Sequence, residues 1–256
     1  MSSLNNDGVW SGLQGIIRGI EAFATALEKA NIWYQDNNEK ISEYLLVFAD
    51  FSVWSIAVDE LIERQIVFTD DLPQELATEI YNGADIERLI SSYYFENNAQ
   101  NMEQLINRCQ HYEQIQKYSE LYAQIISAYH MNHCLLACIG LFSLIDGVLA
   151  DVSDQTTTNF KSRLNIVKEK IGESKKLNEI DRKAFCIYRA FKSFDSSIFF
   201  NSDLSKEEPQ RINRHWDLHG RTHREHDKID FLKVLLWLDA IIFMSRQDLQ
   251  QSEEGE

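Results

Sequence analysis

The sequence predicts an all-α protein, because it contains few residues that break helices and its apolar residues recur with helical spacing. Its 256 residues include only two prolines and ten glycines. Apolar side chains return every three or four positions along most of the chain, which is the repeat of an amphipathic helix. A hydrophobic share of 44% and a charged share of 25% are typical of a globular chain with a sizeable core.

The first part of the chain is predicted to form several amphipathic helices, each with one apolar face. The stretch TDDLPQELATEIY begins one of them, because a capping residue precedes Pro73, which is expected in the first turn. Three residues before the proline are candidates for that cap: Thr69, Asp70 and Asp71. The other helices are expected over residues 9–30, about 39–64, 85–95 and 99–110.

From about Gln116 the sequence is more apolar, and here we predict the central helix of the fold. Residues 116–151 form either one long helix or two abutting helices. The middle of this segment is apolar nearly all round, as a buried helix is. The helices expected after it lie over residues 159–171, 178–200, from Pro209 to a stop at Gly220, and over 226–249.

The composition changes near residue 115, where polar helices give way to the apolar segment. No linker marks this change, so the two parts are expected to pack together. We therefore divide the chain into an N-terminal helical extension over residues 1–115, a helical domain over 116–250 and a disordered acidic tail over 251–256.

Charge, cysteines and apolar runs restrict the class of protein. A formal net charge of −15 argues against a surface that binds nucleic acid broadly, since phosphate binding leaves a basic surface. The four cysteines have no CxxC pairing and are interpreted as core residues in a reducing compartment. The first residues have neither the basic region nor the apolar region of a signal peptide, so none is expected. The longest apolar run, Cys134 to Ile145, is too short to span a bilayer. We expect a cytoplasmic protein without membrane attachment.

Residues 211–226, RINRHWDLHGRTHREH, are the exception to this acidic composition. Four of the seven histidines and four arginines lie there, against two acidic residues. RNA carries its own nucleophile, the ribose 2'-hydroxyl, so its cleavage requires a base, an acid and a cation but no metal. Histidine can act as base or acid near neutral pH, and arginine donates two hydrogen bonds to phosphate. The residue types in this segment therefore fit RNA cleavage.

Helical geometry limits how these side chains can cooperate. Arg214 and His219 are five positions apart and point about 140° from each other on a straight helix, whereas His215 and His219 share a face. Arg214 and His219 therefore do not face one substrate from one straight helix. Either the helix distorts at Gly220, or two copies of the segment meet in a dimer and complete each other's sites. We favour the dimer.

The segment resembles a known signature. INRHWDLHGR is similar to the R-x4-6-H motif of the HEPN superfamily, in which a polar residue usually follows the arginine. The wider pattern NRHxxLHG before a long apolar helix resembles a bacterial subgroup of HEPN-like proteins, whose upstream helix often reads like ACIGLFSLIDGVLAD. The resemblance covers roughly residues 116–250. It implies a HEPN-like helical bundle that forms a homodimer, with both motifs facing one cleft.

The resemblance also implies an activity. Many members of the superfamily are metal-independent endoribonucleases of toxin–antitoxin, abortive-infection or other anti-phage systems, which implies an RNA substrate, a possible antitoxin partner and neither cofactor nor metal. Arg214 and His219 would be catalytic, with His215 assisting. Some members that carry the motif are not nucleases, so the alternative is a non-catalytic HEPN-like dimer that binds a nucleotide or a partner protein.

The other charged residues of the segment have two interpretations each. Three arginines either bind the RNA backbone or pair with Asp217, Glu225 or Asp227; they are Arg211, Arg221 and Arg224. A third, weaker hypothesis is a zinc-dependent hydrolase, because three histidines have a spacing that can converge on zinc, although Gly220 interrupts their helix. These are His219, His223 and His226.

Residues elsewhere also admit more than one interpretation. His130, His133, Cys134 and Cys138 have ligand-like spacing, but their apolar neighbours favour packed core positions. Asp146 lies in an apolar helix and needs a partner. It either orients Arg214 or pairs structurally with an internal arginine or lysine, and we favour the structural pair. Two aromatic residues either stack on bases or pack in the core or a dimer interface, and packing is favoured. These are Trp216 and Trp237.

Overall fold

The computed structural model describes residues 52–67, 73–153 and 202–253, with side chains up to Phe243. It also describes Thr25, Lys29, 198–200 and five positions between 160 and 166. This part of the chain is 72% helical and has no strand, so the all-α prediction is confirmed. Most of the residues in the helices predicted over 9–30, 159–171 and 178–200, and residues 39–51 of the helix predicted over about 39–64, lie outside the described part of the chain.

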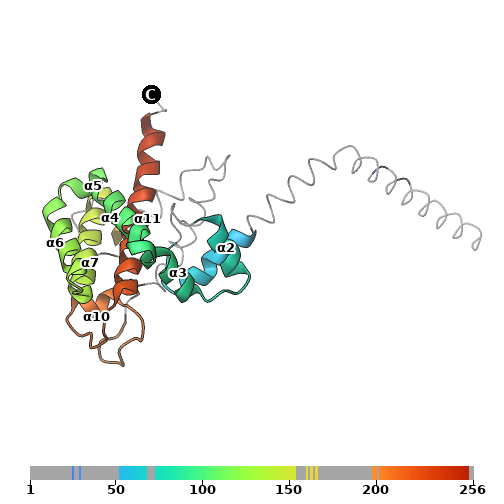
Figure 1. Cartoon of the computed structure of the whole chain (residues 1–256). Coiled ribbons are helices and arrows are strands. Elements are labelled where there is room, and N and C mark those ends of the chain that lie inside the picture. The colour runs from blue at the N-terminus through green and yellow to red at the C-terminus, as the bar shows by residue number, and fades with distance from the viewer. Residues whose placement is uncertain are drawn as a thin grey trace, which may run out of the picture. The chain divides into compact units, whose positions relative to one another are not determined.

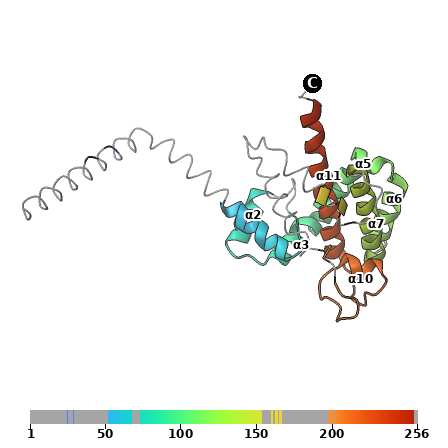
Figure 2. The ribbon, with the colours of Figure 1, turned by 180° about the vertical axis from the view of Figure 1, so that it is seen from behind.

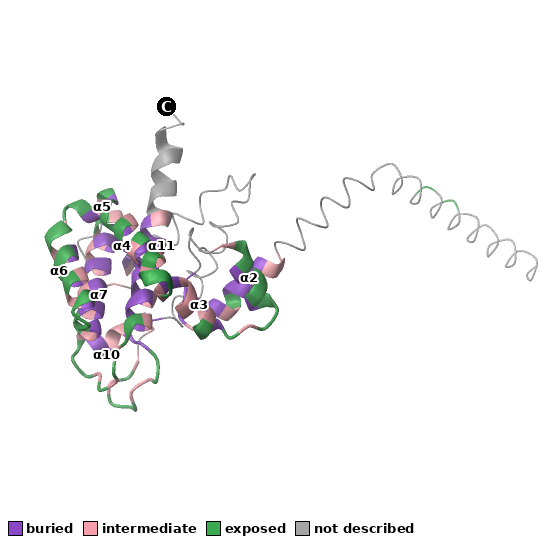
Figure 3. Ribbon diagram, in the orientation of Figure 1, coloured by how far each residue is buried: buried purple, intermediate pink, exposed green. Residues whose placement is uncertain are grey.

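Three helices form the centre of the described fold: α6 (Ser119–His130), α7 (Cys134–Val152) and α11 (Lys228–Glu253). The apolar helix α7 packs against both α6 and α11, and these helices lie side by side in Figures 1 and 2. Figure 3 shows how much of α7 is buried. Its nine buried residues include Leu141, Phe142 and Ile145, as expected for the central helix.

The segment predicted as one long helix or two abutting ones forms a helical hairpin after the short α5 (Glu113–Gln116). Asn132 adopts a left-handed backbone with φ 62°, and the N–H of His133 donates to the carbonyl of Ala128 at 2.8 Å. This hydrogen bond ends α6 and reverses the chain. The hydroxyl of Tyr118, just before α6, therefore reaches the carboxylate of Asp151 near the end of α7, at 2.9 Å.

The two helices of this hairpin approach closely at Gly140. A Cβ atom added there would lie 2.5 Å from Cγ1 of Ile125 on α6. That separation is far below van der Waals contact, so any larger side chain would force the Ile125 side chain or the helices to move. The glycine in the middle of an apolar helix thus has a packing role.

Before the hairpin, the chain forms α2 (Gln74–Tyr81), α3 (Ile86–Phe95), a turn of 3-10 helix, η1 (Asn97–Ala99), and α4 (Gln100–Gln110). Residues 52–63 are also helical. Helices α3 and α4 lie within one residue of the ranges predicted, 85–95 and 99–110, but α2 begins only after the proline that was expected in its first turn. Pro73 is its capping position rather than a residue of its first turn. The three predicted capping residues lie outside the described part.

A buried ion pair joins α4 to α11. The carboxylate of Asp239, 3% exposed, accepts hydrogen bonds from Arg108 at 2.7 and 3.1 Å and from the Tyr112 hydroxyl at 2.7 Å. Segments on both sides of residue 115 therefore share one core, and the compact units divide instead into Met1–Ser52 and Val53–Glu256.

Helix boundaries near the end differ from those predicted. The last helix, α11, begins at Lys228, two residues late, and runs to Glu253, so it overlaps the tail predicted over 251–256. Helix α7 is 19 residues long and ends at Val152, one residue after the end predicted at residue 151, so it extends beyond the apolar run Cys134 to Ile145. By length and composition alone, α7 is the one described helix that could cross a membrane, a property that core helices share. The absence of a membrane role stays a prediction.

Candidate functional site

The basic segment contains a much shorter helix than the sequence suggested. Helix α10 has five residues, Arg214–Leu218, and lies against α7. Its cap is Asn213, whose side-chain oxygen accepts from the N–H of Trp216 at 3.1 Å and whose amide donates to the carbonyl of Phe200 at 2.9 Å. The prediction that Pro209 starts this helix is wrong, because the Asn213 side chain caps the helix four residues later.

The predicted stop at Gly220 is confirmed. Gly220 has φ 61°, and the N–H of Arg221 donates to the carbonyl of Trp216 at 3.0 Å. This ending places His219 at the final, capping position of α10, where it is exposed. The loop that follows is largely exposed, as Figure 3 shows.

Arg214 is half-buried and held from two directions. Its backbone N–H donates to the carbonyl of Ile198 at 2.8 Å, and its guanidinium lies 4.1 Å from the centre of the Phe160 ring. Burial lowers the pKa of Arg214, the carboxylate of Asp146 raises it and the charge of Arg163 lowers it again. Among the residues described, no acidic side chain forms a hydrogen bond or ion pair with this guanidinium.

His215 and His219 pack on each other, as their spacing predicted. Their ring centres are 4.6 Å apart, at 64°. Burial, together with the charges of His219 and Arg214, lowers the pKa of His215 below its usual value near 6.5. His215 is therefore neutral at pH 7 and able to accept a proton. Within one chain, Arg214 contacts Phe160 while His219 contacts His215, so the two predicted catalytic residues face different neighbours.

The three arginines proposed to bind RNA have different surroundings. Arg211 is exposed over the ring of Phe200 at 5.1 Å. Arg221 is also exposed and donates to the carbonyl of Leu204 at 3.2 Å. Arg224 forms an ion pair of 2.8 Å with Asp230, which is not one of the three acidic partners expected from the sequence. Arg211 and Arg221 have charges open to solvent, whereas that of Arg224 is engaged.

A buried histidine–carboxylate pair fixes the far end of the segment. Nε2 of His226 lies 3.0 Å from the carboxylate of Asp217, and both side chains are at most 2% exposed. Burial alone would lower the pKa of His226, but the hydrogen bond and charge of Asp217 outweigh it and raise the pKa. His226 thus points into the fold while His219 points out. Among the described residues no group of three potential ligands could hold a metal ion, so the zinc hypothesis gains no support.

Two further contacts to this segment had no signal in the sequence. The carboxylate of Glu208 accepts from the hydroxyl of Thr222 at 2.5 Å and from the N–H of His223 at 2.9 Å. Gln65, buried with φ 64°, donates from its side chain to the carbonyl of Ile212 at 2.9 Å. Partners so distant in sequence follow no periodic pattern.

The structural alternatives favoured elsewhere are mostly confirmed. Asp146 pairs with Arg163 at 2.9 Å, an internal arginine as expected. Trp216 and Trp237 are 5% and 1% exposed and therefore belong to the core. Cys134 and Cys138 are buried, as is Cys109, and all three are free thiols. His130 and His133 are exposed, so their assignment to the core was wrong.

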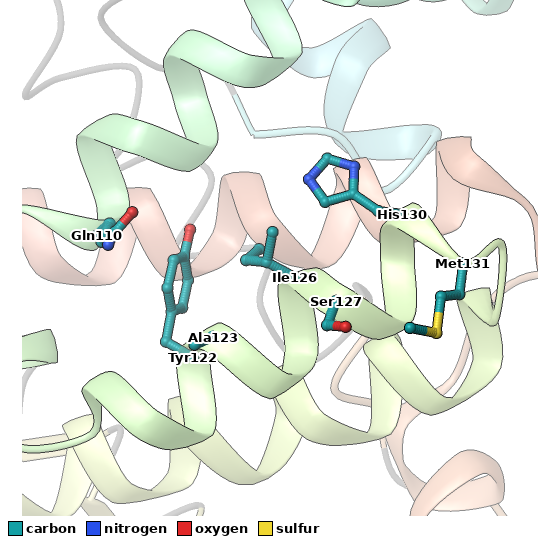
Figure 4. A pocket seen from close by; sticks show the side chains of 7 residues that line it. All are labelled: Gln110, Tyr122, Ala123, Ile126, Ser127, His130 and Met131. Atoms are coloured by element: carbon teal, nitrogen blue, oxygen red, sulfur yellow. The ribbon is translucent and has the colours of Figure 1, made fainter.

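A pocket of about 460 Å³ lies between α4 and α6, away from the basic segment. Figure 4 shows its lining, in which polar side chains such as Gln110, Ser127 and His130 alternate with apolar ones such as Ile126 and Met131. None of its lining residues belongs to residues 211–226, so it is not part of the candidate site.

No family model, curated protein or solved structure matches this chain. The candidate site is therefore defined by the geometry described above: a guanidinium with no acidic partner in the described part of the chain, next to two imidazoles in edge-on contact.

Proposed function

We propose that this protein is a metal-independent RNA endonuclease of the HEPN type. It acts as a homodimer in the bacterial cytoplasm, in toxin–antitoxin or anti-phage defence, where an antitoxin is a further partner. One observation supports the proposal: His215, neutral at pH 7, has an edge-on ring contact with the exposed His219, next to an Arg214 guanidinium that has no acidic partner among the described residues.

The chemistry is an intramolecular transesterification. A histidine removes the proton from the ribose 2'-hydroxyl, the 2'-oxygen attacks phosphorus and the bond to the 5'-oxygen breaks. The leaving oxygen receives a proton from a second acid, giving a 2',3'-cyclic phosphate and a 5'-hydroxyl. Arg214 binds the phosphate, His219 transfers a proton and His215 assists, since each group stabilises charge or moves a proton in the transition state.

A dimer supplies what one chain lacks. In one protomer Arg214 and His219 face different neighbours, so a second copy of the segment is needed to bring guanidinium and imidazole to the same phosphate. Arg211 and Arg221, both exposed, bind adjacent backbone phosphates. These local cations act against an overall charge of −15.

The test is cleavage of structured and unstructured RNA by the purified protein in EDTA. The wild type is expected to release 2',3'-cyclic ends. His219→Ala and Arg214→Ala should each lower the rate at least roughly 100-fold, the scale of a positioned proton transfer or cation. His223→Ala is the matched control, because His223 is an exposed histidine of the adjacent loop with no assigned role. Absence of cleavage, or cleavage that survives His219→Ala, rejects the nuclease.

Mixing the two inactive variants tests the dimer. If each site takes its arginine and its histidine from different protomers, a mixed dimer keeps one intact site and cleavage returns. No recovery after subunit exchange contradicts the shared site.

The second candidate is a non-catalytic HEPN-like dimer that binds a nucleotide or a partner protein. The charge of −15 favours it, because an acidic surface opposes RNA. This alternative predicts a stable complex with no RNA turnover and little effect of His219→Ala on assembly.

A further inference from the structure

Arg214, the first residue of α10, and Arg163 are both under the influence of one carboxylate. Asp146 on α7 pairs with Arg163, and its charge also acts on Arg214. The three side chains together carry two positive charges and one negative charge. One positive charge is therefore left over at this place in the fold.

Among the described residues, Arg163 is the one that forms an ion pair and hydrogen bonds with Asp146. Its Nη1 donates to Oδ1 of Asp146 at 2.9 Å and to the backbone carbonyl of the same residue at 3.2 Å. The Arg163 side chain is only 10% exposed, against 35% for Asp146. A guanidinium so deeply buried cannot turn outward toward a ligand without breaking both hydrogen bonds.

Among the described residues, Arg214 has no direct partner for its charge. It stacks on the ring of Phe160, and its buried Nε has no hydrogen-bond partner. Burial lowers the pKa of Arg214, while the opposed charges of Asp146 and Arg163 act in opposite directions. A half-buried cation that lacks hydrogen bonds is well suited to an external oxyanion, because it has already lost part of its hydration.

We propose that Arg163, outside the basic segment, is a positioning residue that keeps Arg214 available for a phosphate group by holding Asp146. The proposal rests on the proposed function only in assigning phosphate to Arg214. It names a residue with no place in the R-x4-6-H pattern. Without Arg163, the Asp146 carboxylate is free to pair with Arg214, which then competes with phosphate.

The test is titration with inorganic phosphate at pH 7 and constant ionic strength. Binding is followed by ¹⁵N NMR of the arginine Nε–H groups, with Arg214→Lys used to assign the Arg214 signal. Arg163→Gln is expected to weaken phosphate binding roughly tenfold, the scale of one charge-assisted hydrogen bond. Asp146→Asn should bind phosphate as tightly as the wild type or more tightly, since it removes the competing carboxylate.

The double variant Arg163→Gln/Asp146→Asn distinguishes positioning from a structural role. It retains Arg214 without the competing acid, so phosphate affinity should return to about the wild-type value. Arg64→Gln is the matched control, because Arg64 forms an ion pair of 2.9 Å with Glu60 elsewhere, and it should change nothing. Circular dichroism checks that each variant is folded.

Three results overturn the inference. If the wild type does not bind phosphate, or if Arg214→Lys binds phosphate as tightly as the wild type, Arg214 is not the site. A double variant as weak as Arg163→Gln shows that Arg163 binds phosphate itself or only supports the fold. If Arg163→Gln does not fold, Asp146→Asn replaces it in the test. Weaker phosphate binding by Asp146→Asn than by the wild type would then overturn the inference, because the carboxylate would not be a competitor of phosphate. Failure of RNA cleavage alone leaves the phosphate result, and hence the inference, standing.

Discussion

The two histidines of α10 have a chemistry that follows from their mutual contact. His215 is partly covered and lies near two groups that carry or can gain positive charge, so its proton is held less tightly than in water. His219, at the exposed end, meets solvent and substrate first. The pair thus offers a neutral base beside an imidazole that can exchange protons with the surroundings.

Replacing His219 should raise the pKa of its neighbour. In His219→Gln the repulsion from a second imidazolium is gone, so the pKa of His215 should move up toward its usual value of about 6.5. The measurement is an NMR pH titration of the His215 Cε1 proton. An unchanged or lower midpoint would show that the ring contact does not couple the two groups.

His226 should stabilise the fold most strongly at low pH. Its pKa in the folded state is raised above the unfolded value near 6.5, so its stabilising effect is complete below that value and is lost as pH rises through the folded pKa. His226→Gln should lower the free energy of unfolding by about 3 kcal/mol at pH 5.5, the scale of a broken buried ion pair, and by less at pH 9. Urea unfolding at both values, with His223→Gln as an exposed control, measures this. A larger loss at pH 9 would contradict the assignment.

At the scale of elements, the α6–α7 hairpin depends on one close approach. Two apolar helices joined by three residues have to face each other, and Gly140 lets them do so without a gap. An apolar pattern predicts that both helices are buried. It does not say that one folds back on the other, since an apolar segment of this length fits one long helix equally well.

Gly140→Ala should destabilise the protein although alanine is the better helix former. Helix propensity favours the change by about 1 kcal/mol, and overpacking against Ile125 opposes it by about 1–3 kcal/mol. The free energy of unfolding in urea should fall, while Ser143→Ala on an exposed site of the same helix should have little effect. Adding Ile125→Ala should cost less in the Gly140→Ala background than in the wild type. Simple additivity of the two changes would refute the contact.

For the molecule as a whole, the described residues from Val53 onward belong to one compact unit with one hydrophobic core. Asp239 on α11 binds Arg108 and Tyr112, which precede residue 115, inside this core. Burial and the adjacent Asp239 carboxylate raise the pKa of Tyr112, so its hydroxyl stays a donor at physiological pH. The polar network therefore joins the two parts of the chain that differ in composition.

Asp239→Ala should weaken both parts together. Removing one partner of a buried ion pair leaves Arg108 partly buried without its carboxylate and should cost about 3–5 kcal/mol. Far-UV circular dichroism and tryptophan fluorescence should report one coincident urea transition, shifted to lower concentration. Two separate transitions would show that the parts on either side of residue 115 unfold independently.

The sequence by itself determined the features that depend on local spacing. It predicted the helical class from apolar periodicity, the stop at Gly220 from the need for a left-handed residue, and the shared face of His215 and His219 from their separation of four. These follow from backbone geometry within one or two turns. The burial of α7 and α11 was predictable for the same reason, because a helix with so many apolar residues around its surface has to be buried.

Only the tertiary structure decided which partner each polar group meets. Asp146 pairs with Arg163 rather than Arg214, Asp217 pairs with His226, and Gln65 binds the backbone of Ile212. The shortness of α10 likewise depends on Asn213, which is held by the distant carbonyl of Phe200. A buried polar group forms hydrogen bonds with whichever partner the folded chain places next to it. Which residues become neighbours depends on packing between distant segments, and no local sequence pattern encodes it.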